Sequence, residues 1–100
     1  MKNIEFKLTE QGRGAFVIED KEEKLAEMAV AVSDGNLIVY HTEVSDKLKG
    51  QGVGLKLIGQ MIEYARKEDL KVVPLCSFVH AQFERREDEY ADIWNKNWKL

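Results

Sequence analysis

Three glycines at alternate positions form the part of the sequence best suited to chemistry. Gly50, Gly52 and Gly54 stand immediately before a segment with helical periodicity. Glycine allows a positive φ and lets a backbone or a ligand approach closely. The first amide N–H groups of a helix lack partners within it and favour anions, and Lys49 and Lys56 add positive charge. The pattern predicts a diphosphate-binding turn; a tight connection that uses glycine for its geometry alone is the alternative.

Two other phosphate-binding motifs can be compared directly with this turn. A P-loop ends in Gly-Lys-Ser/Thr, whereas Gly54 is followed by Leu55-Lys56-Leu57, with no hydroxyl for magnesium. The dinucleotide fingerprint needs glycine or alanine three positions after its second glycine. That position holds Leu55 or Leu57, depending on the starting glycine. Neither motif is therefore present.

The remaining reactive side chains are few. The chain has two histidines, His41 and His80, and one cysteine, Cys76. They are widely separated and lack the spacing of a zinc site, so the sequence predicts no metal. A single cysteine cannot form an internal disulfide, and a chain without internal disulfides is typical of a reducing, cytoplasmic setting.

The residues ahead of the glycines are predicted to form four strands. Apolar and polar residues alternate near 4–8, and short apolar stretches follow at 15–18, 25–32 and 37–44. Turn residues such as Ser33-Asp34-Gly35-Asn36 separate these stretches. Strands joined by short turns pair antiparallel with their neighbours, which predicts a four-stranded meander.

The residues after the glycines are predicted to alternate between helix and strand. Apolar residues three and four apart, from Val53 to Ala65, indicate an amphipathic helix. Residues 71–76 are typical of a fifth strand, 78–86 of a second helix, and 90–94 of a further helical turn. The predicted fold class is α+β: an antiparallel meander, a crossover helix, a fifth strand parallel to the fourth, and a C-terminal helix.

Length and composition narrow the function classes. One hundred residues suit a single domain over 1–100 and are too few for two. The net charge of −3 argues against nucleic acid as the main partner. No apolar run approaches the ~18 residues of a membrane span, and the N-terminus lacks the features of a signal peptide. We expect a protein without nucleic-acid or membrane partners, present as a monomer or weak dimer.

The glycine-rich turn resembles a known loop. Lys49-Gly50-Gln51-Gly52-Val53-Gly54 is similar to the acyl-CoA pyrophosphate loop of the GCN5-related N-acetyltransferases, written Arg/Gln-x-x-Gly-x-Gly/Ala. Gly52 and Gly54 match this pattern. Lys49 replaces its Arg or Gln, which keeps a positive charge but loses the fork geometry of arginine.

The resemblance extends over nearly the whole chain and is strongest from His41 to Tyr90. His41-Thr42-Glu43-Val44 and residues 73–79 resemble the compact YjdJ-type subgroup, small proteins that lack the N-terminal helices of larger members. Tyr90-Ala91-Asp92 also fits, whereas Arg86-Glu87-Asp88-Glu89 departs from the His-Pro-Glu usual in that subgroup.

The resemblance implies a fold with a wedge, between the splayed fourth and fifth strands, that holds acetyl-CoA. The pantetheine arm would pair with the backbone of the fourth strand, and the diphosphate would lie on the amides of Gln51 to Gly54. The cofactor-binding residues implied in this way are Val44, Lys49, Gly50, Gln51, Gly52, Val53, Gly54, Leu55 and Lys56.

Acetyl transfer needs a deprotonated amine, a polarised thioester carbonyl and a protonated leaving thiolate. His41 and Glu43 lie two apart in a strand, so their side chains share a face. If that face borders the wedge, His41 could act as a base, and Glu43 as a base through water or as the group orienting His41. Cys76 ends the fifth strand and could accept the acetyl group or protonate the thiolate. Each residue also has a structural alternative. His41 could be a hydrogen-bonded residue at a sheet edge, Glu43 a solvated side chain or a cap for the next loop, and Cys76 a small apolar residue of the core.

The resulting hypothesis is an acetyl-CoA-dependent N-acetyltransferase that transfers acetyl directly to a small-molecule or peptide amine. An acetyl-Cys76 intermediate is its minor mechanism. A non-catalytic acyl-CoA-binding or sensing module is the first alternative, because a short chain leaves little wall for an acceptor pocket. A structural domain whose sheet edge recruits a peptide strand is the second.

Overall fold

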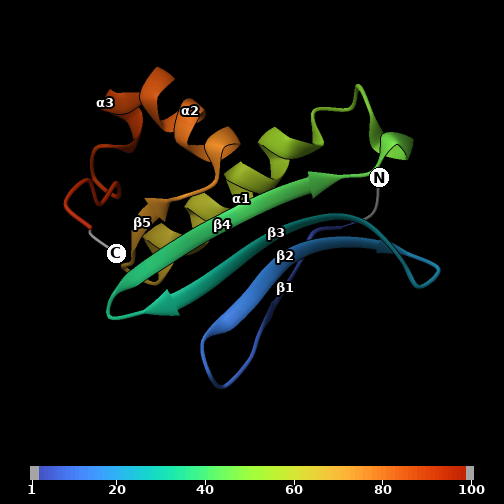
Figure 1. The fold of residues 1–100 in the computed structure, drawn as a ribbon, viewed down its shortest axis with the longest axis horizontal. Coiled ribbons are helices and arrows are strands. Elements are labelled where there is room, and N and C mark those ends of the chain that lie inside the picture. Colours follow the sequence, from blue (N-terminus) through green and yellow to red (C-terminus); the bar gives the residue numbers. More distant parts are fainter. Residues whose placement is uncertain (1–2, 99–100) are drawn as a thin grey trace.

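The fold is that of a computed structural model, which describes residues 3–98. Four strands come first (Figure 1): β1 (Glu5–Leu8), β2 (Arg13–Asp20), β3 (Glu23–Ser33) and β4 (Asn36–Val44). They are followed by the 3₁₀ helix η1 (Asp46–Leu48), helix α1 (Val53–Lys67), strand β5 (Lys71–Pro74), and helices α2 (Ser77–Arg85) and α3 (Glu87–Tyr90).

The five strands form one sheet in the order β1-β2-β3-β4-β5. Strands β1 to β4 pair antiparallel with their sequence neighbours. Strand β5 pairs parallel with β4, from Asn36 opposite Lys71 to Val39 opposite Pro74. The predicted α+β fold, with its meander and its crossover helix to a parallel fifth strand, is therefore confirmed.

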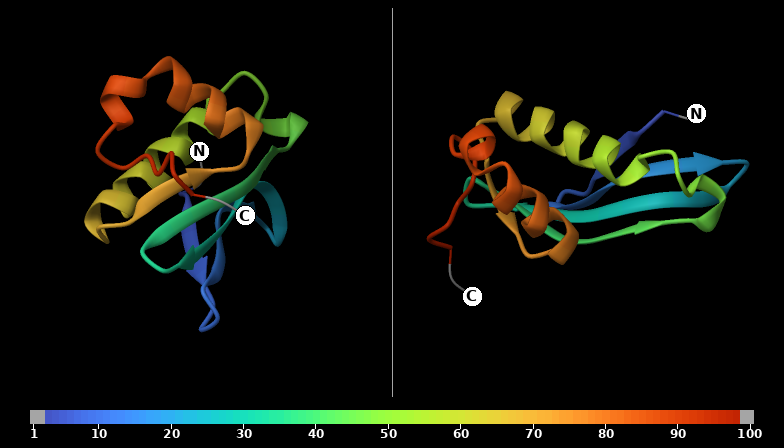
Figure 2. Two further views of the ribbon diagram at one scale, coloured as in Figure 1. Left: turned by 60° about the vertical axis from the view of Figure 1, so that its left-hand side comes forward. Right: turned by 90° about the horizontal axis from the view of Figure 1, so that it is seen from above.

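Helix α1 packs on one face of the sheet through the predicted apolar stripe. Its buried residues are Val53, Leu57, Ile58, Met61, Ile62 and Ala65. They share one core with Phe16, Met28 and Val39 of the strands and with Val79 and Phe83 of α2. The described helices consequently lie on the same side of the sheet, as two further views show (Figure 2).

A β-bulge in β4 changes which residues of that strand face the helices. Ala29 of β3 pairs with His41 and the next residue, Val30, pairs with Val39, so Tyr40 is the extra residue. Before the bulge, Val39 is fully buried in the core. After it, Thr42 pairs with the fully buried Met28. An extra residue shifts the two-residue alternation of a strand by one, so the core-facing positions change from odd to even numbers.

The segment after α3 joins the outer edge of the sheet. Trp94 forms an isolated parallel bridge with Val72 of β5, and the Asn95 amide donates to the Val72 carbonyl at 2.9 Å. Arg66 of α1 donates to the Asp92 carboxylate at 3.2 Å, and these hydrogen bonds hold the pKa of Asp92 below its usual value. The predicted helical turn at 90–94 is present, because the Trp94 amide donates to the Tyr90 carbonyl at 3.0 Å, and Trp94 at its end also meets β5.

Candidate functional site

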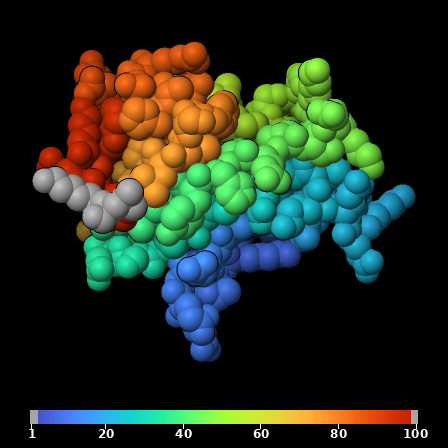
Figure 3. All heavy atoms as spheres, viewed as in Figure 1, coloured from blue at the N-terminus to red at the C-terminus, as the bar shows by residue number. Residues whose placement is uncertain are grey.

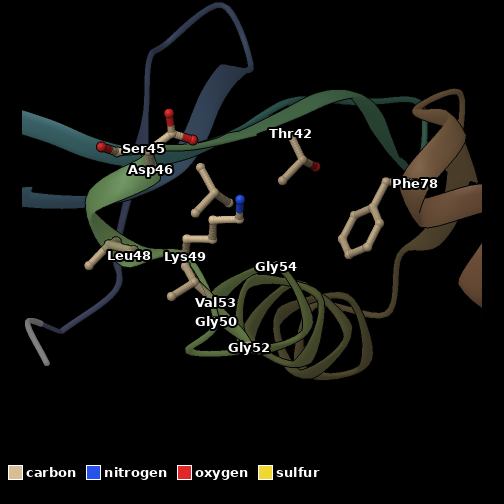
Figure 4. A pocket seen from close by; sticks show the side chains of 11 residues that line it. Thr42, Ser45, Asp46, Leu48, Lys49, Gly50, Gly52, Val53, Gly54 and Phe78 are labelled. Atoms are coloured by element: carbon tan, nitrogen blue, oxygen red, sulfur yellow. The ribbon is translucent and has the colours of Figure 1, made fainter.

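A pocket lies between the end of β4, the η1 loop and the start of α1 (Figure 4). Its volume is about 410 Å³, within the range typical of ligand sites. In the space-filling view, a depression separates α2, in orange, from the η1 loop, in green (Figure 3). The pocket is lined by Thr42, Val44, Ser45, Asp46, Leu48, Lys49, Gly50, Gly52, Val53, Gly54 and Phe78.

The glycines of the turn leave the start of α1 open. Gly52 is the N-cap of α1 and has left-handed backbone angles, φ 67° and ψ 27°, and Gly50 has φ 82°. Both conformations favour glycine. A Cβ atom at either position would meet no atom within 4 Å. These two glycines are therefore required by backbone geometry, and they leave empty space beside the helix start.

The amide groups at this helix start are largely free to bind a ligand. The Gln51 N–H donates to the Leu48 carbonyl at 3.3 Å, and the Lys56 N–H to the Gly52 carbonyl at 3.2 Å. Between them, the N–H groups of residues 52–55 donate to no backbone carbonyl in the described part of the chain. The open donors thus begin one residue later than the predicted set, because the loop itself uses Gln51.

Lys49 adds the positive charge of its side chain to these backbone dipoles. Its side chain extends into the space between β4 and α1 (Figure 4). A helix N-terminus carries a partial positive charge, and an ammonium group next to it strengthens the attraction for an anion. Asp46 lines the same end and offsets part of this charge, so the open amides together with Lys49 are what suit this end of the pocket to a phosphate or diphosphate group.

The opposite end of the pocket is walled by Thr42 and by Phe78 of α2 (Figure 4). A Cβ atom on Gly54 would lie 2.8 and 2.9 Å from two carbons of the Phe78 ring. Such distances are too short for non-bonded carbons, so the absence of a side chain at Gly54 allows α1 and α2 to touch here. Gly54 therefore has a packing role, unlike Gly50 and Gly52.

Cys76 lies where β4 and β5 part. Pairing between the strands ends at Val39 and Pro74, and the Cys76 amide then donates to the Val39 carbonyl at 2.9 Å. The Cys76 sulfur is 3.5 Å from the hydroxyl oxygen of Thr42. Cys76 is buried, with 6% of its surface exposed. It therefore sits behind Thr42, next to the pocket but not in its lining.

His41 and Glu43 are exposed and do not line this pocket. The bulge at Tyr40 turns Thr42 towards the helices and these two residues to the other face of β4. Glu43 borders a small separate hollow together with Glu27 and Lys24. The structure thus brings Cys76 to Thr42, and among the described residues no hydrogen bond joins Cys76 to His41 or Glu43. The catalytic roles of all three stay predictions.

The predicted binding residues divide into two groups. Six of them line the pocket: Val44, Lys49, Gly50, Gly52, Val53 and Gly54. Gln51, Leu55 and Lys56 do not, although the Leu55 amide belongs to the open donors. Sequence reasoning missed Thr42, Ser45, Asp46, Leu48 and Phe78. Only the Ser45-Asp46 pair had a local signal, since serine followed by an acidic residue is typical of a helix start.

The described residues contain no group of three or more His, Cys, Asp or Glu side chains that could hold a metal ion. His80 lies on α2, where its ring meets that of Trp94 edge-on and its Nδ1 is 3.3 Å from Glu84. No helix within residues 3–98 has the length and apolar character needed to cross a membrane.

Comparisons with known proteins agree with this geometry. A family model described as GCN5-related N-acetyl-transferase matches residues 15–93. The solution structure of a GCN5-like protein from Staphylococcus aureus, assigned as an N-acetyltransferase, is 39% identical, with a TM-score of 0.68 over 95% of this chain and 91% of that chain.

A more distant structure shares the fold. Glucosamine-6-phosphate N-acetyltransferase from Arabidopsis thaliana is 17% identical, with a TM-score of 0.54 over 91% of this chain and 66% of that chain. A search of curated proteins gives no match. The family match covers most of the chain and includes the glycine-rich turn, β4, β5 and α2, while the YjdJ-type subgroup stays a prediction. The chain belongs to the GCN5-related N-acetyltransferase family.

Proposed function

We propose that the protein is an acetyl-CoA-dependent N-acetyltransferase whose acceptor is a small-molecule or peptide amine. The observation that carries this proposal is the open start of α1: the amides of residues 52–55 donate to no backbone carbonyl among the described residues, and the adjacent pocket is lined by Lys49 and by two glycines without side chains, Gly50 and Gly52. We also propose a cytoplasmic location, from the single cysteine, and a monomer or weak dimer.

The chain's own groups would hold the donor in two parts. The open amides and Lys49 would bind the diphosphate. The pocket then runs along the end of β4, where Val44 and Thr42 both contribute to its lining, towards the point at which β4 and β5 part. The thioester end of the donor would lie at Thr42 and Phe78, where the lining is hydroxylic or apolar, with Cys76 behind Thr42.

The donor would supply an activated acyl carbon when bound. In the proposed reaction the acceptor nitrogen bonds to that carbon, the carbon–sulfur bond breaks, and the proton lost by the amine balances the one gained by the thiolate. The Cys76 thiol, next to Thr42, is the candidate to relay this proton: it would give its own proton to the leaving thiolate and take up the proton released by the amine. The minor route, attack by Cys76 itself, would need the same thiol to lose its proton first.

The arrangement favours positioning over strong acid–base catalysis. Within the described pocket lining the only ionisable side chains are Asp46 and Lys49, and both lie by the η1 loop. Holding two reactants in the correct geometry can supply ~7–11 kcal/mol of barrier reduction. A base role for His41 or Glu43 requires an acceptor that approaches from the exposed face of β4.

That scarcity of ionisable groups also supports the alternative, a non-catalytic acyl-CoA-binding or sensing module. Both functions need the same diphosphate site and differ only in turnover. Binding and turnover therefore have to be measured separately.

The first experiment is calorimetric titration with acetyl-CoA and with free CoA. We expect both to bind. Absence of heat and of a thermal shift at millimolar ligand would contradict both functions and favour a structural interaction domain.

The second experiment measures release of the CoA thiol with a panel of amines and peptides. Turnover with any acceptor supports the enzyme, whereas binding without turnover across the panel supports the sensing module. Cys76→Ala should keep donor affinity and lower turnover if the thiol takes part. Full activity of that variant would assign Cys76 to packing alone.

A further inference from the structure

We propose that Phe78 sets the length of the acyl group that the site accepts, so that acetyl is selected over longer acyl thioesters. This inference rests on the proposed function, because it concerns the same pocket. It goes beyond it by naming the residue that limits the donor.

The Phe78 ring is fixed from behind. It lies so close to Gly54 that a single added carbon there would overlap it, at 2.8 Å. The ring therefore cannot move towards α1 without pushing the helix backbone. Although it is a large aromatic side chain, 38% of Phe78 is exposed, and it forms part of the pocket wall (Figure 4).

The neighbouring wall is equally well supported. Thr42 comes from β4 and lies beside Phe78, at the same end of the pocket (Figure 4). Its hydroxyl contacts the Cys76 sulfur at 3.5 Å, and Cys76 is part of the buried core. An acyl group placed between Thr42 and Phe78 consequently lies between two walls, each of which is backed by packed atoms.

The polarity of the pocket decides which part of the donor reaches these walls. Lys49 and the open amides of α1 attract the diphosphate, whereas Thr42 and Phe78 carry no charge. The acyl end is therefore assigned to the Thr42–Phe78 gap. Close-packed interiors resist inserted methylenes, and a pocket that excludes one methylene group discriminates by roughly 10- to 200-fold.

The test compares binding of free CoA, acetyl-CoA, butyryl-CoA and hexanoyl-CoA by calorimetry. For the unchanged protein we expect butyryl-CoA to bind at least about 10-fold more weakly than acetyl-CoA. Phe78→Ala should reduce this ratio to below about threefold, with the affinity of the same variant for free CoA as the reference. Phe78→Tyr keeps the wall and should keep the ratio. Leu8→Ala, an exposed residue of β1 away from the pocket, is the matched control and should change nothing.

The outcomes separate this inference from the function on which it rests. If the unchanged protein binds no CoA species, the proposed function fails. If it binds free CoA and acetyl-CoA but Phe78→Ala leaves the butyryl-to-acetyl ratio as it was, the role of Phe78 is overturned while the donor site stands. Circular dichroism melting monitors folding. Should Phe78→Ala not fold, Phe78→Leu applies the same test with a smaller opening and must still lower the ratio.

Discussion

The segments η1 and α1 both begin between β4 and the body of α1, but they differ in whether a side chain caps their first amide groups. At the start of η1, Ser45 is extended and its hydroxyl accepts a hydrogen bond from the Lys47 amide at 3.2 Å. At the start of α1, Gly52 has a left-handed backbone and no side chain with which to accept one. One helix start is closed by its own cap, and the other remains open.

This difference shows that the loop can cap a helix start with a side chain, and that the start of α1 lacks such a cap because Gly52 occupies its N-cap position. A serine N-cap typically contributes about 0.5–2 kcal/mol to helix stability, and Ser45 caps the shorter segment, η1. α1 is the long helix of the fold, with fifteen residues, yet it forgoes that stabilisation. The amides left open are then available to an anionic ligand, which is what the proposed donor site requires.

The largest effect is expected when a negative charge is introduced at the uncapped start of α1. Gly52→Glu should lower CoA affinity by about 100-fold or more, because a carboxylate would occupy the anion site. Gly52→Gln has the same size and the same backbone strain without the charge, and it should lose much less. Calorimetry on the two variants decides. Equal losses would mean that strain at Gly52, and not charge, governs binding.

A second test sharpens the contrast between Gly52 and Gly54. Gly54→Ala should destabilise the protein by roughly 1–3 kcal/mol through overpacking against Phe78. In a Phe78→Ala background the same change should be neutral, or stabilising by up to about 1 kcal/mol, since alanine favours helix. Urea unfolding of the four proteins gives the coupling energy. A coupling energy near zero would contradict the close contact of α1 with α2.

The third test removes the side-chain charge of Lys49 and leaves the backbone amides unchanged. Lys49→Ala should weaken CoA binding by about 10-fold and make it less sensitive to salt, since one charge contact is lost. Lys49→Arg restores the charge with a planar fork that suits phosphate and should bind at least as tightly as the unchanged protein. Titrations at low and high salt measure both. A salt dependence unchanged by Lys49→Ala would remove Lys49 from the site.

The smallest effect is expected at the closed start. Ser45→Ala should cost about 0.5–1 kcal/mol of unfolding free energy through loss of the cap and should change CoA affinity by less than about threefold. Chemical denaturation and calorimetry check the two halves of this prediction. A loss of affinity as large as that of Lys49→Ala would show that Ser45 also contacts the ligand.

Much of the framework could be predicted because it depends on local patterns. The alternating first strands, the stripe from Val53 to Ala65 and the positions of the glycines follow from periodicity and backbone geometry. The end of the chain was less predictable. Residues 90–94 form the helical turn that their sequence predicts, but the bridge from Trp94 to Val72 of β5 joins segments far apart in the chain, and no local pattern shows it.

The orientation of the site residues could not be predicted in the same way. His41 and Glu43 share a face, as their spacing requires, and uninterrupted alternation from Val39 would have turned that face towards α1. The single extra residue at Tyr40 reverses it. A bulge depends on how two strands fit across the sheet, so the sequence of β4 alone does not show it.

The sequence by itself determined the order of elements, the amphipathic face of α1 and the glycine-rich turn, because each is set by residues within a few positions of one another. Only the tertiary structure decided that Thr42 faces the pocket, that Phe78 rests on Gly54 and that Cys76 meets Thr42. These contacts join residues far apart in the chain. Their geometry depends on how the strands and helices pack together, and this packing cannot be predicted from residues that are neighbours in the sequence.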